Sequence, residues 1–276
     1  MQKIEMAYRM SLTKNQDSRS APNLTRVAAI VDGWNITLAS QALALATLTA
    51  DLAQNRGFIL ACMNLDHLVK LRKDSGLRSV YRNPRAHVMA DGAPIAALAR
   101  LKGYIVERST GPDLIIPLCR RAAAKGWPIY LFGTRTDVLE SGARKLKAEC
   151  PGLDIRGIEA PPFGYDPLSS DADAASARMA QSGARIVLLG LGSPKQELFA
   201  NRALARHPEL GFVGIGAGLD FLTGEQVRAP LFLRENGLEW LWRLALNPRR
   251  LGLRYMKCAA LLLELLLRKP PMTERQ

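Results

Sequence analysis

Short apolar runs alternate with amphipathic stretches along most of the chain. The apolar runs predict buried strands at 27–31, 58–63, 87–90, 128–132, 153–158, 185–189 and 212–215. The amphipathic stretches and their capping residues predict helices at 40–55, 68–73, 95–102, 112–125, 137–149, 171–182 and 198–206. Strands that alternate with helices in this way are typical of βαβ units. The predicted fold is therefore α/β, with a Rossmann-like, largely parallel sheet and helices on both faces.

The alternation stops near residue 229, which divides the chain into three predicted segments. Residues 11–23 are polar, which predicts a disordered leader over 1–25, and residues 26–228 predict the α/β domain. Residues 229–276 predict a basic helical appendage with helices at 238–246 and 249–267. The leader has no apolar signal-peptide core, and no run of about 18 apolar residues predicts a membrane-spanning helix.

Polar residues and glycines follow the predicted strands. In open α/β sheets, ligands bind outside the carboxyl ends of the strands. Right-handed connections place the loops after the strands at one edge. The side chains expected there come from Asn64, Asp91, Thr134, Gln196 and Asp220.

Asp91 ends the apolar run 87–90 and precedes Gly92. Two interpretations are open. The carboxylate could cap the helix that follows, as aspartates commonly do, and position alone favours this reading. Alternatively, it could stand uncompensated at the rim of the ligand crevice and act on a substrate.

Three further stretches contain residues suited to binding anions or nucleotides. The glycine-rich turns 190–192 and 214–218 allow backbone N–H groups to approach a phosphate, but neither completes GxGxxG or a Walker A loop. Gln196 can both donate and accept, which suits a uracil edge or a sugar hydroxyl, although a solvated helix start explains it equally well. Arg108 and Thr110 lie beside a predicted helix N-terminus, which favours a diphosphate, whereas a surface pair between Glu107 and Arg108 is the simpler alternative.

The formal net charge of +13 indicates an anionic partner. No nucleic-acid reading motif is present, so a nucleic-acid partner is disfavoured. Between 228 and 269, nine basic residues accompany only three acidic ones, together with tryptophans and a leucine-rich end. This pattern favours a membrane surface, although the helices could instead pack on the domain with their arginines snorkelling, or on a second copy of the chain.

The cysteine and histidine pattern excludes several kinds of site. The four cysteines are far apart, and the three histidines form no HExxH motif. We therefore expect reduced thiols in a cytosolic setting and no bound metal.

Taken together, the motifs resemble those of the WecG/TagA/CpsF family of bacterial glycosyltransferases. The similarity covers roughly residues 27–255, and the motifs that carry it are CMN at 62–64, ADG at 90–92, ERSTGPDL at 107–114, LFG at 131–133, GLGSPKQE at 190–197, GIGA at 214–217, RAP at 228–230, GLEWLWR at 237–243, PRR at 248–250 and RY at 254–255. Position 62 departs from the family, which usually has threonine there.

The resemblance implies a catalytic α/β domain that transfers a sugar from a UDP-sugar to a polyprenyl-diphosphate-linked saccharide. The reaction would take place at the inner face of the cytoplasmic membrane, in exopolysaccharide or cell-envelope synthesis, with no metal or cofactor. The family's general base corresponds to Asp91. Its substrate-binding motif positions fall on Cys62, Asn64, Arg108, Thr110, Gly133 and Gln196, and its C-terminal arginines on Arg243, Arg250 and Arg254.

The implied mechanism is an inverting displacement in which Asp91 takes the proton of the acceptor hydroxyl and arginines stabilise the departing UDP. A nucleotide-sugar-binding protein without turnover is the main alternative. A dehydrogenase and a nucleic-acid-binding protein are weaker ones.

Overall fold

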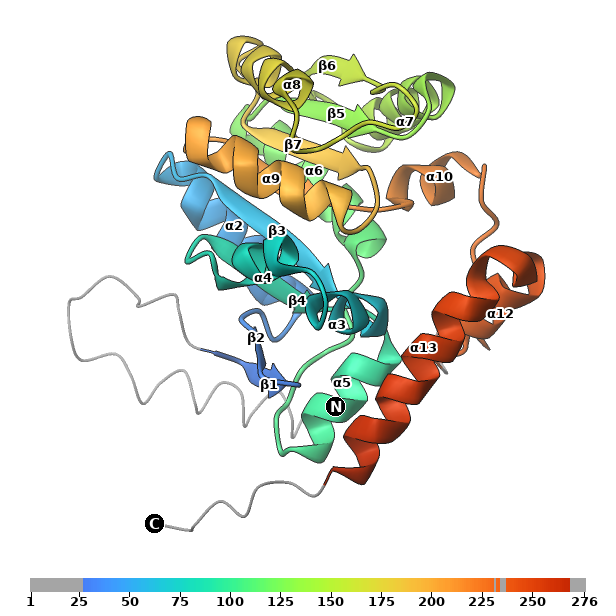
Figure 1. Ribbon diagram of the computed structural model, residues 1–276. Helices are drawn as coiled ribbons and strands as arrows, with labels where there is room; N and C mark the ends of the chain where they lie inside the picture. The colour runs from blue at the N-terminus through green and yellow to red at the C-terminus, as the bar shows by residue number, and fades with distance from the viewer. Residues whose placement is uncertain (1–26, 231, 234–236, 269–276) are drawn as a thin grey trace, which may run out of the picture.

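The computed structural model describes residues 27–230, 232–233 and 237–268 (Figure 1). The predicted leader at 1–25 lies outside the described residues. Six parallel strands form the central sheet in the order β4-β3-β8-β7-β5-β6. They are β3 (Phe58–Met63), β4 (Ala86–Ala90), β5 (Ile129–Gly133), β6 (Ile155–Glu159), β7 (Ile186–Gly190) and β8 (Gly211–Gly214). The predicted α/β class and the parallel sheet are confirmed.

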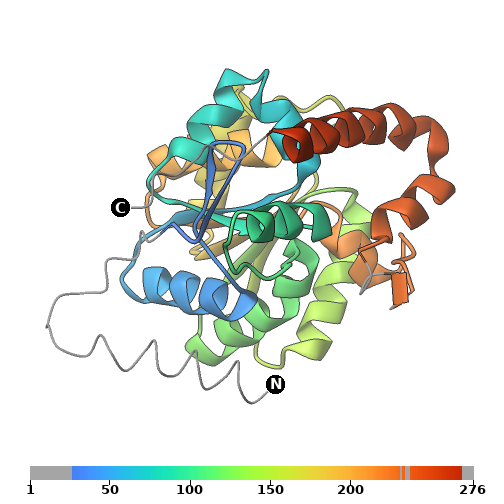
Figure 2. The same cartoon turned by 90° about the horizontal axis from the view of Figure 1, so that it is seen from below.

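Helices cover both faces of this sheet (Figure 2). One apolar cluster joins the sheet to α3 (Leu65–Leu71), α4 (Ser75–Arg82), α5 (Ala93–Leu101), α8 (Ser170–Gln181) and α9 (Lys195–Arg206). The other joins it to α2 (Gln41–Ala53), α6 (Gly111–Lys125), α7 (Thr136–Glu149) and α10 (Gly218–Thr223). Alternate residues of a strand enter opposite clusters, so strands buried on both faces are apolar at every position.

The N-terminal part differs from the predicted elements. The predicted strand at 27–31 is shorter, and it joins no parallel neighbour. Instead β1 (Ala29–Val31) and β2 (Trp34–Ile36) form an antiparallel hairpin. The N–H groups of Thr37 and Leu38 then donate to the Val88 carbonyl, each at 3.1 Å, so the chain after the hairpin lies against the β4 edge. Helix α4 was not predicted.

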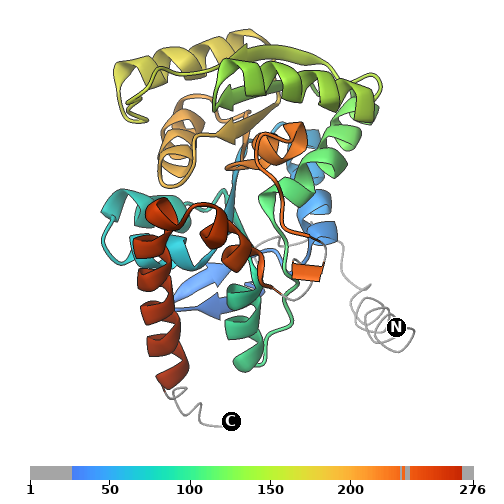
Figure 3. The ribbon, with the colours of Figure 1, turned by 90° about the vertical axis from the view of Figure 1, so that its right-hand side faces the viewer.

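The two predicted C-terminal helices are present as α12 (Glu239–Leu246) and α13 (Pro248–Leu267). Helix α13 runs beside α3 and α5 (Figures 1 and 3). Its Leu261 is 4% exposed and belongs to the same apolar cluster as the sheet. Helix α13 is therefore packed onto the α/β domain. Within the described residues, no helix combines the length and apolar character needed to cross a membrane.

Candidate functional site

A cavity of about 650 Å³ opens at the carboxyl ends of β4, β3, β8 and β7. Strand β4 lies on one side of β3, and all later strands of the sheet lie on its other side. The strand order therefore reverses beside β3, and the cavity lies at this topological switch point. The wall opposite the strand ends comes from α12 and α13. Those helices contribute Glu239, Trp240, Arg243, Arg254 and Tyr255.

Most of the predicted site residues meet in this cavity. Those that line it are Cys62, Asn64, Asp91, Arg108, Thr110, Gln196, Arg243 and Arg254. Gly133 is not among the lining residues. It ends β5, one strand beyond β7, where a Cβ would lie 2.5 Å from the carbonyl carbon of Gly190. The glycine allows these two backbones to approach. Arg250 lies in the first turn of α13, and its side chain is outside the described ones.

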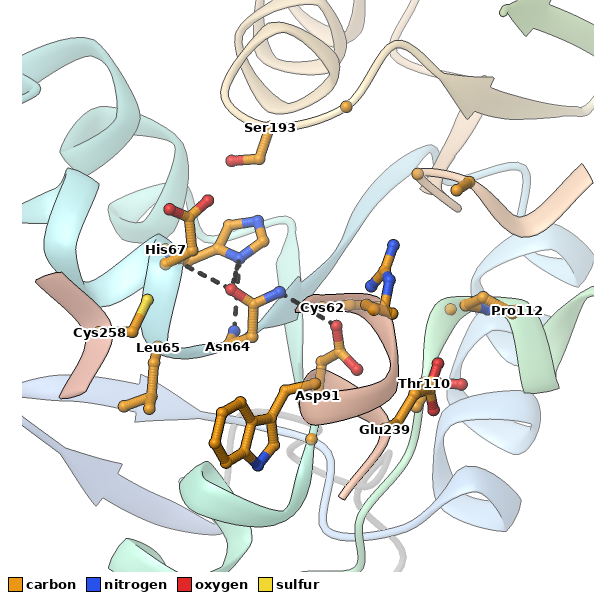
Figure 4. A pocket seen from close by; sticks show the side chains of 18 of the residues that line it. Cys62, Asn64, Leu65, His67, Asp91, Thr110, Pro112, Ser193, Glu239 and Cys258 are labelled. Carbon is orange, nitrogen blue, oxygen red and sulfur yellow. Dashed lines mark hydrogen bonds between the residues drawn. The ribbon is translucent and has the colours of Figure 1, made fainter. Parts of the chain in front are cut away.

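Asp91 directly follows β4, and its side chain points into the cavity (Figure 4). Its backbone N–H donates to the Met63 carbonyl at 2.7 Å. The N-cap of α5 is Gly92, with φ of 87°, and that cap has no side-chain hydrogen bond. The interpretation of Asp91 as a helix cap is therefore wrong. Instead, its Oδ2 accepts from Asn64 Nδ2 at 3.2 Å (Figure 4).

The surroundings of Asp91 raise the pKa of its carboxyl above the usual aspartate value. Burial is the largest cause, and the Glu239 carboxylate adds to it. The Asn64 hydrogen bond and the electrostatic influences of the His67 ring and the Arg243 guanidinium oppose the rise. A carboxylate whose pKa moves toward neutrality is a better proton acceptor than an exposed aspartate.

Asn64 is positioned by its own helix. It is the N-cap of α3, and its Oδ1 accepts from the His67 backbone N–H at 3.2 Å. The amide nitrogen is thereby left to face Asp91.

Cys62 forms part of the cavity wall and stays a thiol. Its Sγ lies 3.8 Å from the Gly214 carbonyl oxygen, toward which the thiol can donate. Burial raises the pKa of Cys62 well above its usual value, and the carboxylates of Asp91 and Glu197 raise it further. The residue can therefore shape the cavity but is a poor nucleophile.

Gln196 is 5% exposed, so the reading as a solvated helix start is wrong. Its Oε1 accepts from the Gly216 N–H at 3.2 Å and its Nε2 donates to Glu197 at 2.8 Å. A Cβ on Gly214 would lie 2.7 Å from Gln196 Nε2, so only glycine lets this amide approach β8.

Cationic side chains converge on the cavity from several elements. Arg228 donates to Asp113 at 2.7 Å, and Thr110 Oγ1 donates to the same carboxylate at 2.6 Å. The Arg243 guanidinium lies 5.4 Å from the centre of the Phe221 ring. The guanidinium groups of Arg108, Arg228 and Arg243 make the cavity suited to phosphates.

Several residues at the cavity were not among the predicted site residues. Those that line the cavity are His67, Arg228, Glu239, Trp240 and Tyr255. Glu197 does not line it, but its carboxylate contacts the His67 ring at 3.3 Å. Glu239 and Trp240 share a motif with Arg243, and His67 follows the Asn64 cap by three residues, which is where a capping box places its second partner. Glu197 likewise ends the motif GLGSPKQE at 190–197, next to Gln196. Across the described ranges, no cluster of three or more His, Cys, Asp or Glu side chains could hold a metal ion.

A protein-family comparison assigns the chain to a family. The family model described as "Glycosyl transferase WecG/TagA/CpsF family" matches residues 29–275. The match begins with β1 and includes both C-terminal helices, so the cavity and all of its walls lie inside the matched region. The resemblance carried by the motifs is confirmed.

Proposed function

Because the chain belongs to the WecG/TagA/CpsF family of glycosyl transferases, we propose that it moves a sugar from a UDP-sugar to a polyprenyl-diphosphate-linked saccharide. The family supports a role in cell-envelope polysaccharide synthesis, and we place the reaction in exopolysaccharide or related pathways. The observation that carries the proposal is the position of Asp91. Its carboxyl has a raised pKa and faces a cavity that is also lined by several arginines.

The proposed reaction is a single displacement with inversion. The acceptor hydroxyl oxygen attacks the anomeric carbon while Asp91 takes the hydroxyl proton. The bond from that carbon to the UDP oxygen breaks, and its electron pair leaves with UDP. A positioned base of this kind contributes about 100- to 10,000-fold to the rate. Arginines stabilise the charge that develops on the diphosphate, in the role that a divalent ion has in other enzymes.

The character of the cavity walls supports an arrangement of the two substrates. Residues 190–193 and 214–217 contribute glycine-rich turns at the ends of β7 and β8, whose bare backbone suits the phosphates of the donor. The opposite side, between α3 and α13, is lined by the apolar side chains of Leu65, Cys258 and Leu262. We infer that the lipid-linked acceptor enters from this side and meets the donor at Asp91.

The outer surface of α13 supports attachment to the membrane face. Its exposed apolar side chains lie on the side of the helix opposite Leu251, Cys258 and Leu261, which face the domain. The exposed set is Leu253, Met256, Leu263, Leu266 and Leu267, each between 52% and 72% exposed. An apolar helix face in a basic segment suits the interface of an anionic bilayer.

The proposal is tested with the purified full chain, a panel of UDP-sugars and a panel of polyprenyl-diphosphate-linked acceptors, in the presence of a chelator. We expect one donor to give product at the same rate with and without chelator, and NMR of the product to show an inverted anomeric centre. Binding of UDP-sugars without product from any acceptor would identify a nucleotide-sugar-binding protein instead. Retention of configuration would contradict the displacement.

A further inference from the structure

The beginning of helix α12 is held beside Asp91 by a close backbone approach. Gly237 lies two residues before the helix and has a φ of 71°. A Cβ at this position would lie 2.5 Å from the Cβ of Ala93, which is the first residue of α5 and lies two positions after Asp91. Only glycine allows this approach. The first turn of α12 is therefore fixed at the rim of the cavity, next to the proposed base.

Trp240, in this first turn, presents an aromatic surface to the cavity. It lines the cavity and is 43% exposed. Its ring contacts that of Tyr255 on α13, with a centroid distance of 6.0 Å and an interplanar angle of 80°. Rings at this angle touch edge to face, so Tyr255 covers at most one face of the indole. The other face of Trp240 remains clear of Tyr255.

Glu239, the residue before Trp240, makes this part of the cavity unsuited to a phosphate. Glu239 and Asp91 both face the cavity (Figure 4). The Glu239 carboxylate raises the pKa of the Asp91 carboxyl, and its effect is larger than the opposing effect of Arg243. The guanidinium of Arg243 lies 5.4 Å from the centre of the Phe221 ring, on α10. Two neighbouring carboxylates repel an anion, whereas their oxygens can accept hydrogen bonds from the hydroxyls of a neutral ligand.

We propose that Trp240 and Glu239 form the subsite for the acceptor sugar whose hydroxyl is glycosylated. In this subsite the sugar ring stacks on the free face of the indole, and hydroxyls beside the attacking one donate to the Glu239 carboxylate. This inference rests on the proposed transfer to a lipid-linked saccharide. A sugar ring has an apolar face of C–H groups and a rim of hydroxyls, so an aromatic face beside a carboxylate suits both parts. The sugar would then lie next to Asp91.

The position of the subsite favours the acceptor over the donor. The glycine-rich turns proposed for the donor phosphates follow β7 and β8, whereas α12 and α13 form the wall opposite the strand ends. Tyr255, which contacts the Trp240 ring, is followed on α13 by Cys258 and Leu262, and all three line the cavity. The aromatic pair thus continues the apolar side from which the lipid is proposed to enter.

The variant Trp240→Ala tests the stacking contact. The probes are farnesyl diphosphate and a panel of farnesyl-diphosphate-linked hexoses and N-acetylhexosamines, and calorimetry measures their binding to the full chain. We expect the wild type to bind at least one sugar-linked probe more tightly than farnesyl diphosphate. Trp240→Ala should weaken that probe about tenfold, Trp240→Phe should restore most of the loss, and binding of farnesyl diphosphate should stay within about twofold in both variants.

The variant Glu239→Ala tests the carboxylate with the same two kinds of probe. It removes the acceptor for the sugar hydroxyls, so the sugar-linked probe should bind about tenfold more weakly. Binding of farnesyl diphosphate should stay the same or become tighter, because a carboxylate that repels the diphosphate is gone. Weaker binding of both probes would contradict the assignment of Glu239 to the sugar.

Trp242→Phe is the matched control, because Trp242 lies on the same helix and is not among the cavity-lining residues. Its Nε1 instead donates to the Val227 carbonyl at 3.3 Å. The control should bind every probe as the wild type does. A wild type that binds no sugar-linked probe better than farnesyl diphosphate, or a Trp240→Ala variant that binds them all normally, would overturn the proposal.

Turnover of Trp240→Ala separates the acceptor from the donor. We expect the KM of the acceptor to rise about tenfold and the KM of the UDP-sugar to stay within about twofold. A rise in the donor KM alone would place the donor sugar at Trp240 and overturn the assignment. The binding measurements need no turnover, so the absence of transfer from every UDP-sugar would count against the proposed function and not against this subsite.

Discussion

Asp91 is subject to opposing influences that come from separate parts of the chain. Burial and Glu239 raise the pKa of its carboxyl, while Asn64, His67 and Arg243 lower it. The balance leaves a carboxyl with a raised pKa that still has a hydrogen-bond donor for its ionised form. At the residue scale, this is what a general base needs, since it must be ionised before the reaction and basic enough to take a proton.

Two α12 variants should move the pH profile in opposite directions. In the proposed reaction turnover needs ionised Asp91, so kcat/KM should fall as the pH drops through its raised pKa. Glu239→Gln removes a carboxylate that raises this pKa, so the acidic limb should move to lower pH. Arg243→Ala removes a cation that lowers it, so the limb should move to higher pH. The measurement is kcat/KM against pH for the three proteins. Limbs that coincide, or that move the same way, would remove Asp91 as the titrating group.

The sequence predicted the site residues that follow the ends of strands. It did not predict the buried residues that contact those site residues from the protein interior. Asn64, Asp91 and Gln196 follow apolar runs, and the rule for α/β sheets places such positions at one edge. Glu197 pairs with a histidine 130 positions earlier, and nothing in either local pattern marks that contact. The cap interpretation of Asp91 failed because Gly92 takes the cap position with a positive φ, which no propensity for aspartate reveals.

Helix α13 has two apolar faces with different surroundings. Leu251, Cys258 and Leu261 are buried against the domain. Ion pairs fix the helix at both ends, with Arg254 lying 3.2 Å from Asp66 and Glu264 lying 2.6 Å from Arg72. At the element scale, this helix therefore closes the cavity on one side and presents a second apolar face outward.

Leucines on the two faces of α13 should differ sharply in their contribution to stability. Leu261→Ala removes methyl groups from the core and should lower the free energy of unfolding by about 2–5 kcal/mol. Leu263→Ala, at a position that is 59% exposed, should change it by less than about 0.5 kcal/mol. Urea unfolding followed by circular dichroism measures both. Equal effects would mean that α13 does not pack on the domain in solution.

The predicted elements were most accurate where the signals were long and well capped. The strand at 58–63 and the end of the helix at 125 agree with β3 and α6. The hairpin of β1 and β2 was missed because strands of three residues are too short to show a period of two. Helix α4 was missed because its eight residues are mostly polar and only three are buried.

The whole molecule combines a cavity lined by several arginines with an adjacent outward-facing apolar surface. The chain has a net charge of +13, and α13 exposes several leucines. The cavity opens beside the same helix. A substrate whose diphosphate is anionic and whose tail is apolar would match both features. The membrane-associating role expected of residues 229–276 stays a prediction, and the alternative, packing on the domain, is present for α13.

Charged substitutions on the outer face of α13 should release the protein from anionic vesicles. We expect Leu263→Glu with Leu267→Glu to weaken vesicle binding at least tenfold. Both leucines are exposed in the protein, and each change replaces an apolar side chain that would enter the bilayer by a carboxylate that anionic lipids repel. Leu168→Glu, in the loop before α8, is the control and should bind as the wild type does. Co-sedimentation at low and high salt measures the binding. If the double variant instead changes only the sedimentation coefficient, the surface joins two copies of the chain.

The most direct test of the proposed chemistry is the turnover of Asp91→Asn with the donor and acceptor found in the panel, alongside calorimetric binding of UDP. Asparagine keeps the size of the side chain and can still bond to Asn64, but it cannot take a proton. We expect kcat to fall by about 100- to 10,000-fold while the affinity for UDP stays within about threefold. Near-normal turnover with intact UDP binding would show that another group accepts the proton.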